Sequence, residues 1–235
     1  MLAKCIASQC ASTFFSVSSA TITSKWVGEG EKLVRALFLV AQSKLPSIVF
    51  MDEIDSLLAK RADDESEGTR RVKTELLMQI DGVATNADNA SQAASLLVIG
   101  ATNKPKAIDE AARRRLSSRI YIPLPDAEGR KQFLQRMLTS KQNVMNEGEI
   151  NVVVESTAGY SGSDLAQLCN DAARAPLRML MQSGISITNI QLEDVPPIAA
   201  AHFAAALMRV RSSVQPCELA EYEAWDQQFG SAAYR

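Results

Sequence analysis

The sequence predicts an α/β protein, in which a doubly wound and mostly parallel sheet is followed by a small domain made only of helices. Three observations predict this fold class. Strand-like and helix-like segments alternate over the first half of the chain. The segment "SIVFM", residues 47–51, is an unbroken apolar run, as expected of a parallel strand covered on both faces. After Pro123 and Pro125, only helical patterns follow.

The spacing of apolar residues predicts each element in turn. The expected strands are 12–17, 47–51, 96–101 and 119–124. The helices expected beside them are 2–9, 29–44, 68–80 and 108–116, with the polar stretch "TNADNASQAAS", residues 85–95, as a surface loop. The later helices are 127–139, 147–155, 161–182, 197–210 and 217–230. We therefore expect a sheet domain over 1–125, a helical domain over 126–212 and a C-terminal helix within 213–235.

Composition is that of an ordinary globular protein, with 235 residues, 46% hydrophobic and 22% charged. A net charge of -2 argues against broad electrostatic binding to nucleic acid or to a membrane, although it is compatible with a local basic patch. No apolar run reaches the roughly 18 residues of a membrane helix, so we expect no membrane insertion. Four scattered cysteines without a CxxC pair, and a single histidine, argue against a thiol-rich metal site. A reducing compartment such as the cytoplasm is the simplest interpretation of these cysteines.

The first 25 residues allow two interpretations. They contain no acidic residue and are rich in Ser and Thr, which is typical of organelle transit peptides. They also lack arginine, and "STFFSV" is a good strand. We prefer the end of a helix that leads into this strand.

The last helix carries an aromatic and aliphatic stripe, formed by Leu219, Tyr222, Trp225 and Phe229. This spacing places the four side chains along one face. The stripe either packs on its own domain or docks on a neighbouring subunit.

Polar residues stand at the ends of two expected parallel strands. Asp52 and Glu53 follow the strand 47–51, and Asn103 follows the strand 96–101. In an open parallel sheet, ligands bind beyond the carboxyl ends of the strands, so these side chains are expected to converge. A carboxylate at a strand end can also cap the next helix; the second polar strand end favours a site.

Phosphoryl transfer suits this trio of residues. An acid after a buried strand holds Mg²⁺, usually through water, and an adjacent carboxylate can orient and deprotonate the attacking water. Asn103 would then help to place that water or contact the γ-phosphate.

At this point the chain resembles a known family. "SIVFMDEID" resembles the Walker B motif of AAA ATPases, "GATNKP" their first sensor, and "IDEAARRRLSSRIYIPLP" the segment with their arginine fingers. "TSKWVGEGEKLVRALF" and "GYSGSDLAQLCNDAA" narrow the resemblance to the microtubule-severing group with fidgetin, spastin and katanin. "CIASQ", "STFFSVSS" and "YEAWDQQFG" are most similar to fidgetin-like proteins, and the resemblance covers nearly the whole chain.

The resemblance implies ATP and Mg²⁺ as cofactors and a homo-hexamer as the assembly. It implies that Asp52 associates with Mg²⁺, Glu53 is the catalytic base and Asn103 is the first sensor. Arg114 and Arg115 would be arginine fingers that reach the nucleotide of the next subunit, although an arginine run can also be a solvated helix face. The sensor 2 region, which approaches the nucleotide, is matched by Gly159, Ser161, Gly162 and Asp164.

The resemblance also implies a substrate pore. Lys25, Trp26 and Val27 match the first pore loop, and Arg70 and Arg71, after "ADDESEG", match the second. In a hexamer, these basic residues would favour acidic peptides such as tubulin tails. A buried Trp26 and a plain surface loop around Arg70 are the alternatives.

One family motif is not in the printed sequence, namely the phosphate loop G-x-x-x-x-G-K-[ST]. The resemblance places Met1 at or just after the end of that loop, and Lys4 cannot replace its lysine because no glycine precedes it. We expect a truncated sequence, and poor ATP binding by the chain as printed.

Three functions stay open: a severing ATPase, an ATPase that disassembles other filaments, and a non-catalytic subunit that lends arginine fingers to a neighbour. ATPases that disassemble other filaments carry an added β-rich insertion in the small domain, and residues 183–200 are too few to form one.

Overall fold

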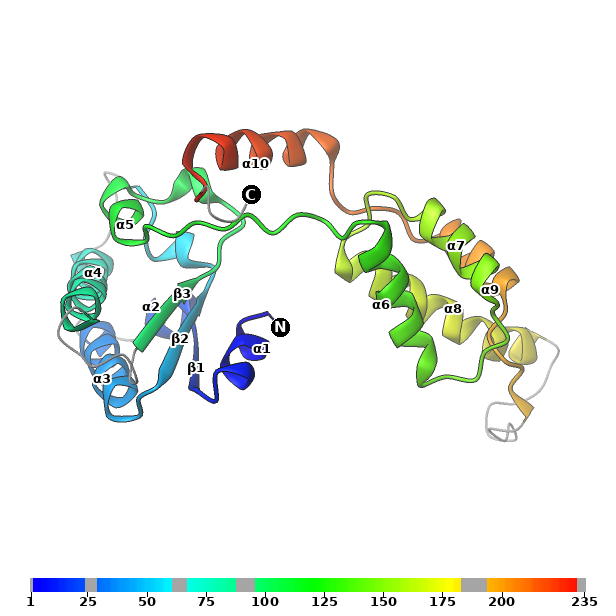
Figure 1. Ribbon diagram of the computed structural model, residues 1–235, viewed down its shortest axis with the longest axis horizontal. Helices are drawn as coiled ribbons and strands as arrows, with labels where there is room; N and C mark the ends of the chain where they lie inside the picture. Colours follow the sequence, from blue (N-terminus) through cyan, green and yellow to red (C-terminus); the bar gives the residue numbers. More distant parts are fainter. Residues whose placement is uncertain (1, 24–28, 61–66, 88–95, 183–193, 232–235) are drawn as a thin grey trace. The chain divides into compact units, whose positions relative to one another are not determined.

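The computed structural model describes residues 2–23, 29–60, 67–87, 96–182 and 194–231 (Figure 1). The chain forms two compact units. The first, called the sheet unit below, comprises residues 1–119 together with 229–235, and the second, the helical unit, comprises 120–228. Each unit has its own hydrophobic core. The chain therefore passes between the units twice.

The sheet unit is built on three parallel strands in the order β1 (Thr13–Ser18), β2 (Ser47–Asp52) and β3 (Leu96–Gly100). The register pairs Ser18 with Asp52, and Met51 with Gly100, so that the carboxyl ends of all three strands meet at one edge. The central strand β2 is the most buried, as its unbroken apolar sequence predicts.

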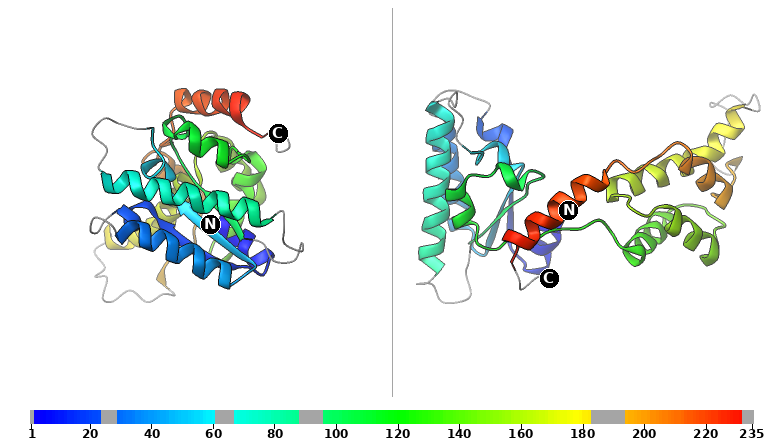
Figure 2. Two further views of the ribbon diagram at one scale, coloured as in Figure 1. Left: turned by 90° about the vertical axis from the view of Figure 1, so that its left-hand side faces the viewer. Right: turned by 90° about the horizontal axis from the view of Figure 1, so that it is seen from above.

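Helices cover both faces of this sheet. Figures 1 and 2 show α3 (Glu29–Ser43) and α4 (Glu67–Ala87) on one face and α1 (Leu2–Gln9) on the other. The remaining helical pieces of the unit are α2 (Ser19–Thr23), α5 (Glu110–Arg115) and the 3₁₀ turns at Ile54–Ser56 and Pro105–Ala107. Phe38, Val49 and Leu76 are fully buried between the sheet and its helices. The predicted α/β class is confirmed.

The strand predicted over 119–124 is wrong. This segment has neither helix nor strand structure, and Ile120 and Ile122 are 55% and 63% exposed. Alternation of apolar residues predicted a strand, but a strand also needs a hydrogen-bonded neighbour. The described part of the chain supplies none for this segment, and Pro123 and Pro125 have no N–H to donate.

The helical unit contains α6 (Ala127–Thr139), α7 (Glu147–Ser156), α8 (Gly162–Gln182), α9 (Ala200–Leu207) and most of α10 (Pro216–Phe229). Side chains cap the first two, since Asp126 accepts from Gly129 N–H and Asn146 forms a capping box with Glu149. The helix predicted over 197–210 starts later because Ile198 exchanges backbone hydrogen bonds with residues 142 and 144.

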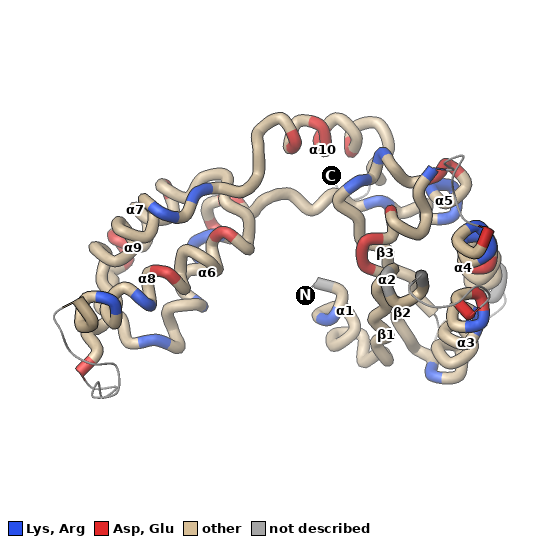
Figure 3. Tube along the Cα trace, turned by 180° about the vertical axis from the view of Figure 1, so that it is seen from behind, with Lys and Arg blue, Asp and Glu red and all other residues tan. Residues whose placement is uncertain are grey.

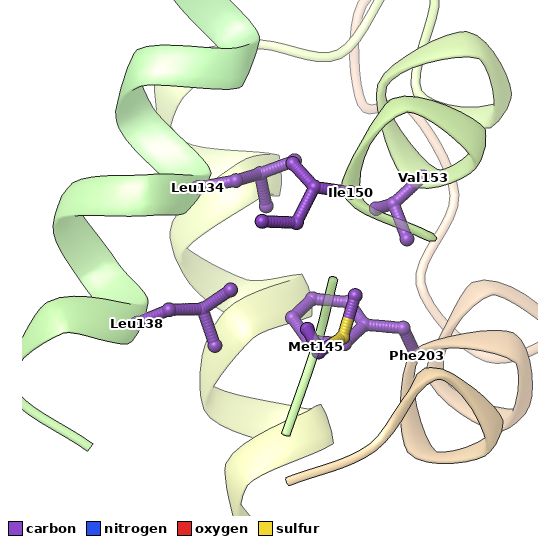
Figure 4. A pocket seen from close by; sticks show the side chains of 6 residues that line it. All are labelled: Leu134, Leu138, Met145, Ile150, Val153 and Phe203. Carbon is purple, nitrogen blue, oxygen red and sulfur yellow. The ribbon is translucent and has the colours of Figure 1, made fainter. Parts of the chain in front are cut away.

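The interior of the helical unit is a packed core. Figure 4 shows where the core side chains of α6, α7 and α9 meet, and there is essentially no room for a water molecule between them. The residues that line this spot are all apolar: Leu134, Leu138, Met145, Ile150, Val153 and Phe203. A ligand therefore has no place at this spot.

The aromatic stripe of α10 contacts its own chain. All four of its residues are half-buried, the Tyr222 ring lies 6.4 Å from that of Tyr121, and Phe229 contacts Arg113. Tyr222 thus packs within the helical unit, and Phe229, which ends α10, packs on Arg113 of the sheet unit. Among the helices that the structure describes, none combines the length and apolar character needed to cross a bilayer.

Candidate active site

The carboxyl end of β2 holds its two carboxylates in an unusual backbone turn. Glu53 has φ 50° and ψ 46°, the left-handed conformation, which costs a non-glycine residue about 1–2 kcal/mol. Asp52 Oδ1 accepts a hydrogen bond from Glu53 N–H at 3.0 Å, and the Glu53 carbonyl accepts from the N–H and the hydroxyl of Ser56 at 3.0 and 2.8 Å. Both acidic side chains are exposed. Strain of this kind, retained by surrounding hydrogen bonds, is typical of functional sites.

The loop after β3 is tied to this turn. Ile54 N–H donates to the Ala101 carbonyl at 3.0 Å, and Ala101 N–H donates to the Met51 carbonyl at 2.8 Å. A methyl group at Gly100 would lie 2.5 Å from Ile54 Cδ1, so the two loops are in tight contact. Asn103, three residues beyond Gly100, is exposed at the same sheet edge as Glu53. The structure thus brings the ends of both strands together, as the sequence predicted.

Asp55 is a residue of this site that sequence reasoning missed. Its Oδ1 accepts from the Thr102 hydroxyl at 2.6 Å, and Thr102 Oγ1 in turn accepts from Lys104 N–H at 2.9 Å. This bridge joins the loop of Glu53 to the loop of Asn103. The third carboxylate of "DEID" was the available signal, because a side chain one 3₁₀ turn beyond the strand end can reach the next strand.

The donor set at this edge fits a hydrated Mg²⁺ better than a tightly ligated metal. Within the residues that the structure describes, no three His, Cys, Asp or Glu side chains gather closely enough to hold a metal alone. Mg²⁺ normally keeps several waters and takes one or two carboxylates together with phosphate oxygens. An exposed Asp52 at the strand end is compatible with that mode.

The arginine run lies in and around α5, a helix of six residues (Figure 3). Asp109 caps its start by accepting from Ala111 N–H at 2.8 Å, and the buried Lys73 ammonium lies 3.2 Å from the same carboxylate. The helix is therefore anchored at its first turn.

Three consecutive arginines end this helix, and they differ in their contacts. Arg113 lies over the Phe229 ring, 5.2 Å from the centroid. Arg115 forms an ion pair with Asp81 of α4 at 2.8 Å, with 33% of its side chain exposed. In the described part of the chain, the one polar partner of Arg114 is Glu110, one turn back in its own helix, and 76% of the Arg114 side chain is exposed. Arg114 is the arginine best placed to reach another molecule.

The predicted pore residues are only partly described. Lys25, Trp26 and Val27 lie outside the described residues. Arg70 and Arg71 are exposed in the first turn of α4, where they line a groove of about 310 Å³. The same groove is lined by Glu31, Glu67, Thr74, Glu75 and Met78.

This groove has mixed charge, because three glutamates line it with the two arginines. Arg71 pairs with Glu67 at 2.5 Å, and the buried Glu75 receives two hydrogen bonds from Arg35, at 2.9 and 3.1 Å. These bonds from Arg35 hold the pKa of Glu75 below its ordinary value. The basic channel expected from Arg70 and Arg71 is thus partly neutralised within the chain.

The predicted sensor 2 residues form the start of α8 in the helical unit. Asp164 Oδ2 accepts from Ser161 N–H at 2.9 Å, from the Ser161 hydroxyl at 2.8 Å and from Ser213 N–H at 3.2 Å. Burial by itself raises the pKa of Asp164, but these hydrogen bonds outweigh it and the pKa lies below the ordinary value. Gly159 has φ 80°, and Gly162 is the first residue of α8. Ser161 also caps the start of α8, since Asp164 N–H donates to its hydroxyl at 3.2 Å.

A strand-end acid pair on a parallel sheet, followed in the chain by a short arginine-bearing helix, is the arrangement expected of an α/β protein of the AAA type, and comparison with known proteins agrees on this class. The model of the ATPase family associated with various cellular activities (AAA) matches residues 1–124. The AAA+ lid domain matches 149–191, and the Vps4 C terminal oligomerisation domain matches 179–230. The chain belongs to the AAA family of ATPases, and the last match supports self-assembly.

Curated relatives place the chain near the fidgetin-like proteins. It is 48% identical to Fidgetin-like protein 1 of Rattus norvegicus over 230 residues, which covers 98% of this chain and 33% of that protein. It is also 48% identical to spastin of Dictyostelium discoideum over 231 residues, 98% of this chain and 34% of that protein. The chain thus spans about a third of the length of the curated relatives it matches.

Solved structures give the same result for the fold. The crystal structure of the FIGL-1 AAA domain matches with a TM-score of 0.86 and 47% identity, covering 98% of this chain and 73% of that one. The same domain in complex with ADP matches with a TM-score of 0.85 and 46% identity over 98% of this chain and 74% of that one. A katanin structure, described as the basis for katanin self-assembly, matches with a TM-score of 0.77 and 34% identity over 96% and 72%.

Proposed function

We propose that this chain is the catalytic part of a protein-remodelling ATPase, in which hydrolysis is performed at the ends of β2 and β3 and completed by a neighbouring subunit. The observation that carries the proposal is the strained turn of Glu53, hydrogen-bonded to Asp52 and fixed to the loop of Asn103. The division into 1–125, 126–212 and 213–235 is kept as the proposed domain organisation.

In the proposed reaction, Asp52 associates with Mg²⁺ through water and Glu53 accepts a proton from the attacking water. Mg²⁺, when bound, neutralises negative charge on the phosphates. The left-handed turn directs Glu53 away from the sheet and into solvent, where a water can reach it. A positioned base of this kind contributes about 10²–10⁴ in rate. Asn103, on the adjoining loop, would orient the same water or the γ-phosphate.

Arg114 and Arg115 are proposed as arginine fingers for the neighbouring subunit. A guanidinium matches phosphate oxygens with a planar fork of donors, and an arginine finger contributes about 10³–10⁵ in rate. The exposure of Arg114 supports its role more directly than that of Arg115, which would first have to release Asp81. Gly159, Ser161 and Gly162 would approach the nucleotide from the helical unit.

The assembly is proposed to be a homo-hexamer that threads an acidic peptide, and tubulin tails are the substrate we favour. The match to an oligomerisation domain and the likeness to spastin and katanin support it. Lys25, Trp26 and Val27 would contact the peptide together with Arg70 and Arg71. The cytoplasm, at the cytoskeleton or in reach of the nucleus, is the compartment that such a substrate implies.

Replacing Glu53 with Gln tests the proposal. The printed sequence contains no phosphate loop, so the chain is extended at its N-terminus with the loop of a fidgetin-like relative. We expect Glu53→Gln to bind ATP as the extended parent does and to lose turnover by about 10²–10⁴, because the amide cannot accept the proton. Fluorescent-nucleotide titration and phosphate release measure the two quantities. Turnover that survives the substitution would remove Glu53 as the base.

A further inference from the structure

Residues 229–231 contact the last turn of α5, the short helix that carries Arg114, and Arg119 just after it. Helix α5 has only six residues, and helices so short are not stable in water by themselves. Asp109 and Lys73 hold its first turn, but its last turn, which carries the three arginines, needs other contacts. Asp81 of α4 holds Arg115, and the sheet unit supplies further contacts from residues 229–231, more than a hundred positions away in the sequence.

Arg119 makes the central contacts. Its Nη2 donates to the Arg113 carbonyl in the last turn of α5 at 2.5 Å, and its Nη1 donates to the Phe229 carbonyl, the last residue of α10, at 2.9 Å. Carbonyls at helix C-termini lack partners within the helix and carry partial negative charge, which a guanidinium satisfies well. One cation therefore joins the ends of two helices.

Backbone bonds fix the C-terminal segment in the same place. Arg119 N–H donates to the Ser231 hydroxyl at 2.8 Å, and Ser231 N–H donates to the Arg119 carbonyl at 2.9 Å. Residues 229–231 are therefore held in two ways: the Arg119 backbone bonds to Ser231, and the Arg119 guanidinium bonds to the Phe229 carbonyl.

Phe229 also contacts α5 through its ring. The Arg113 guanidinium lies 5.2 Å from the ring centroid, within the range of a cation–π interaction. Arg113 Nε is buried without a hydrogen-bond partner in the described part of the chain, so the ring face is its principal support. Arg113 is thus held inward, while Arg114, the next residue, projects outward with 76% of its side chain exposed.

We propose that Arg119, Phe229 and Ser231 are positioning residues for the arginine finger: they fix the last turn of α5 so that Arg114 is presented to the nucleotide of the neighbouring subunit. The inference rests on the proposed function of Arg114. Rate enhancement by a positioned charge depends on geometry, and a displacement of about 1 Å can cost on the order of 10² in rate. Phe229 and Ser231 would not touch substrate and act only through α5.

Phe229→Leu and Arg119→Lys test the proposal, with Gln228→Ala as control. Leucine keeps an apolar side chain but has no ring face, and lysine keeps the charge but cannot bridge two carbonyls with a fork. In the hexamer of the loop-bearing chain, we expect either variant to lower kcat for ATP about 10-fold with KM unchanged, because the finger acts in the transition state. Gln228, exposed and adjacent to Phe229, should be replaceable without effect.

Mixed hexamers separate a misplaced finger from a damaged subunit. A Glu53→Gln subunit cannot hydrolyse its own ATP but still offers an intact Arg114. Adding it to Phe229→Leu subunits should raise their turnover at least about 3-fold, because the finger acts in trans. Unchanged kcat in both variants, or a loss that Glu53→Gln subunits do not rescue, would overturn the proposal. Full turnover by Arg114→Ala would instead overturn the finger itself, which distinguishes the two failures.

Amide hydrogen exchange gives a readout without nucleotide. In the 235-residue chain, Arg113 N–H bonds to the Asp109 carbonyl and Leu116 N–H to the Ala112 carbonyl, both at 3.0 Å. We expect Phe229→Leu and Arg119→Lys to speed exchange at Leu116 about 10-fold and Gln228→Ala to leave it unchanged. Equal protection of Leu116 in all three would contradict the role of the C-terminus.

Discussion

The acidic turn after β2 and the acidic turn at the start of α8 use their carboxylates in opposite ways. Asp164 is buried, and one of its oxygens accepts hydrogen bonds from Ser161 and Ser213. Glu53 is exposed on a left-handed backbone whose own carbonyl and N–H are satisfied by Ser56 and Asp52. At the start of α8, the Asp164 side chain satisfies backbone N–H groups. After β2, backbone and neighbouring groups hold the turn, and the Glu53 side chain is left exposed. Burial and hydrogen-bond partners, rather than the presence of an acid, thus distinguish the structural carboxylate of Asp164 from the exposed one of Glu53, for which we propose a chemical role.

Glu53→Gly gives the largest effect that this comparison predicts. Turnover of the loop-bearing chain should fall by about 10²–10⁴, because the base is lost. Stability should rise by about 0.5–1 kcal/mol, because glycine adopts the left-handed conformation without the cost that glutamate incurs, less its greater loss of chain entropy. Phosphate release and urea unfolding measure the two effects. A less stable variant would mean that the Glu53 side chain supports the fold.

Asp164→Ala should have the reverse profile. Losing the acceptor removes the hydrogen bonds from the N–H groups of half-buried Ser161 and exposed Ser213, and with them part of a helix cap, which costs about 1–2 kcal/mol. The unfolding midpoint of the helical unit should fall, while residues in β2 keep their hydrogen-exchange protection. A free energy of unfolding within about 0.5 kcal/mol of the parent value would show that the Asp164 side chain does not stabilise the fold.

Acid titration sharpens the comparison with a smaller effect. Because the folded-state pKa of Asp164 is lowered by its hydrogen bonds, its contribution to stability is complete above its unfolded pKa of about 4 and is lost as pH falls through the folded value. The parent should therefore lose stability below about pH 4 more steeply than Asp164→Asn does. Unfolding midpoints across this range measure the difference, and parallel curves would show that Asp164 has an ordinary pKa.

The sequence was sufficient for the strands of the core and for the position of the acid pair. Apolar runs and helical spacing depend on local pattern, so residues 2–9 and 127–139 were predicted with their observed bounds. The strand at 119–124 failed because pairing is a tertiary property. The role of Phe229 in the arginine helix could not be predicted either, since it depends on contacts with Arg113 and Arg119 across more than a hundred residues.

Within the candidate site, the sequence predicted which residues lie at the strand ends but not the contacts that hold them. The positions of Asp52, Glu53 and Asn103 follow from the parallel order of β2 and β3, which the apolar runs indicate. The bridge from Asp55 to Thr102 and the left-handed turn of Glu53 are set by packing between loops, and no local pattern encodes them.

The contact between Gly100 and Ile54 has a consequence for how this site can vary. With Ile54 Cδ1 2.5 Å from where a side chain at position 100 would begin, any residue larger than glycine at position 100 requires the Ile54 side chain to shift. The turn of Glu53 and the loop of Asn103 are thus joined by a pair of matched volumes, and a larger residue at position 100 should be tolerated best together with a smaller one at position 54.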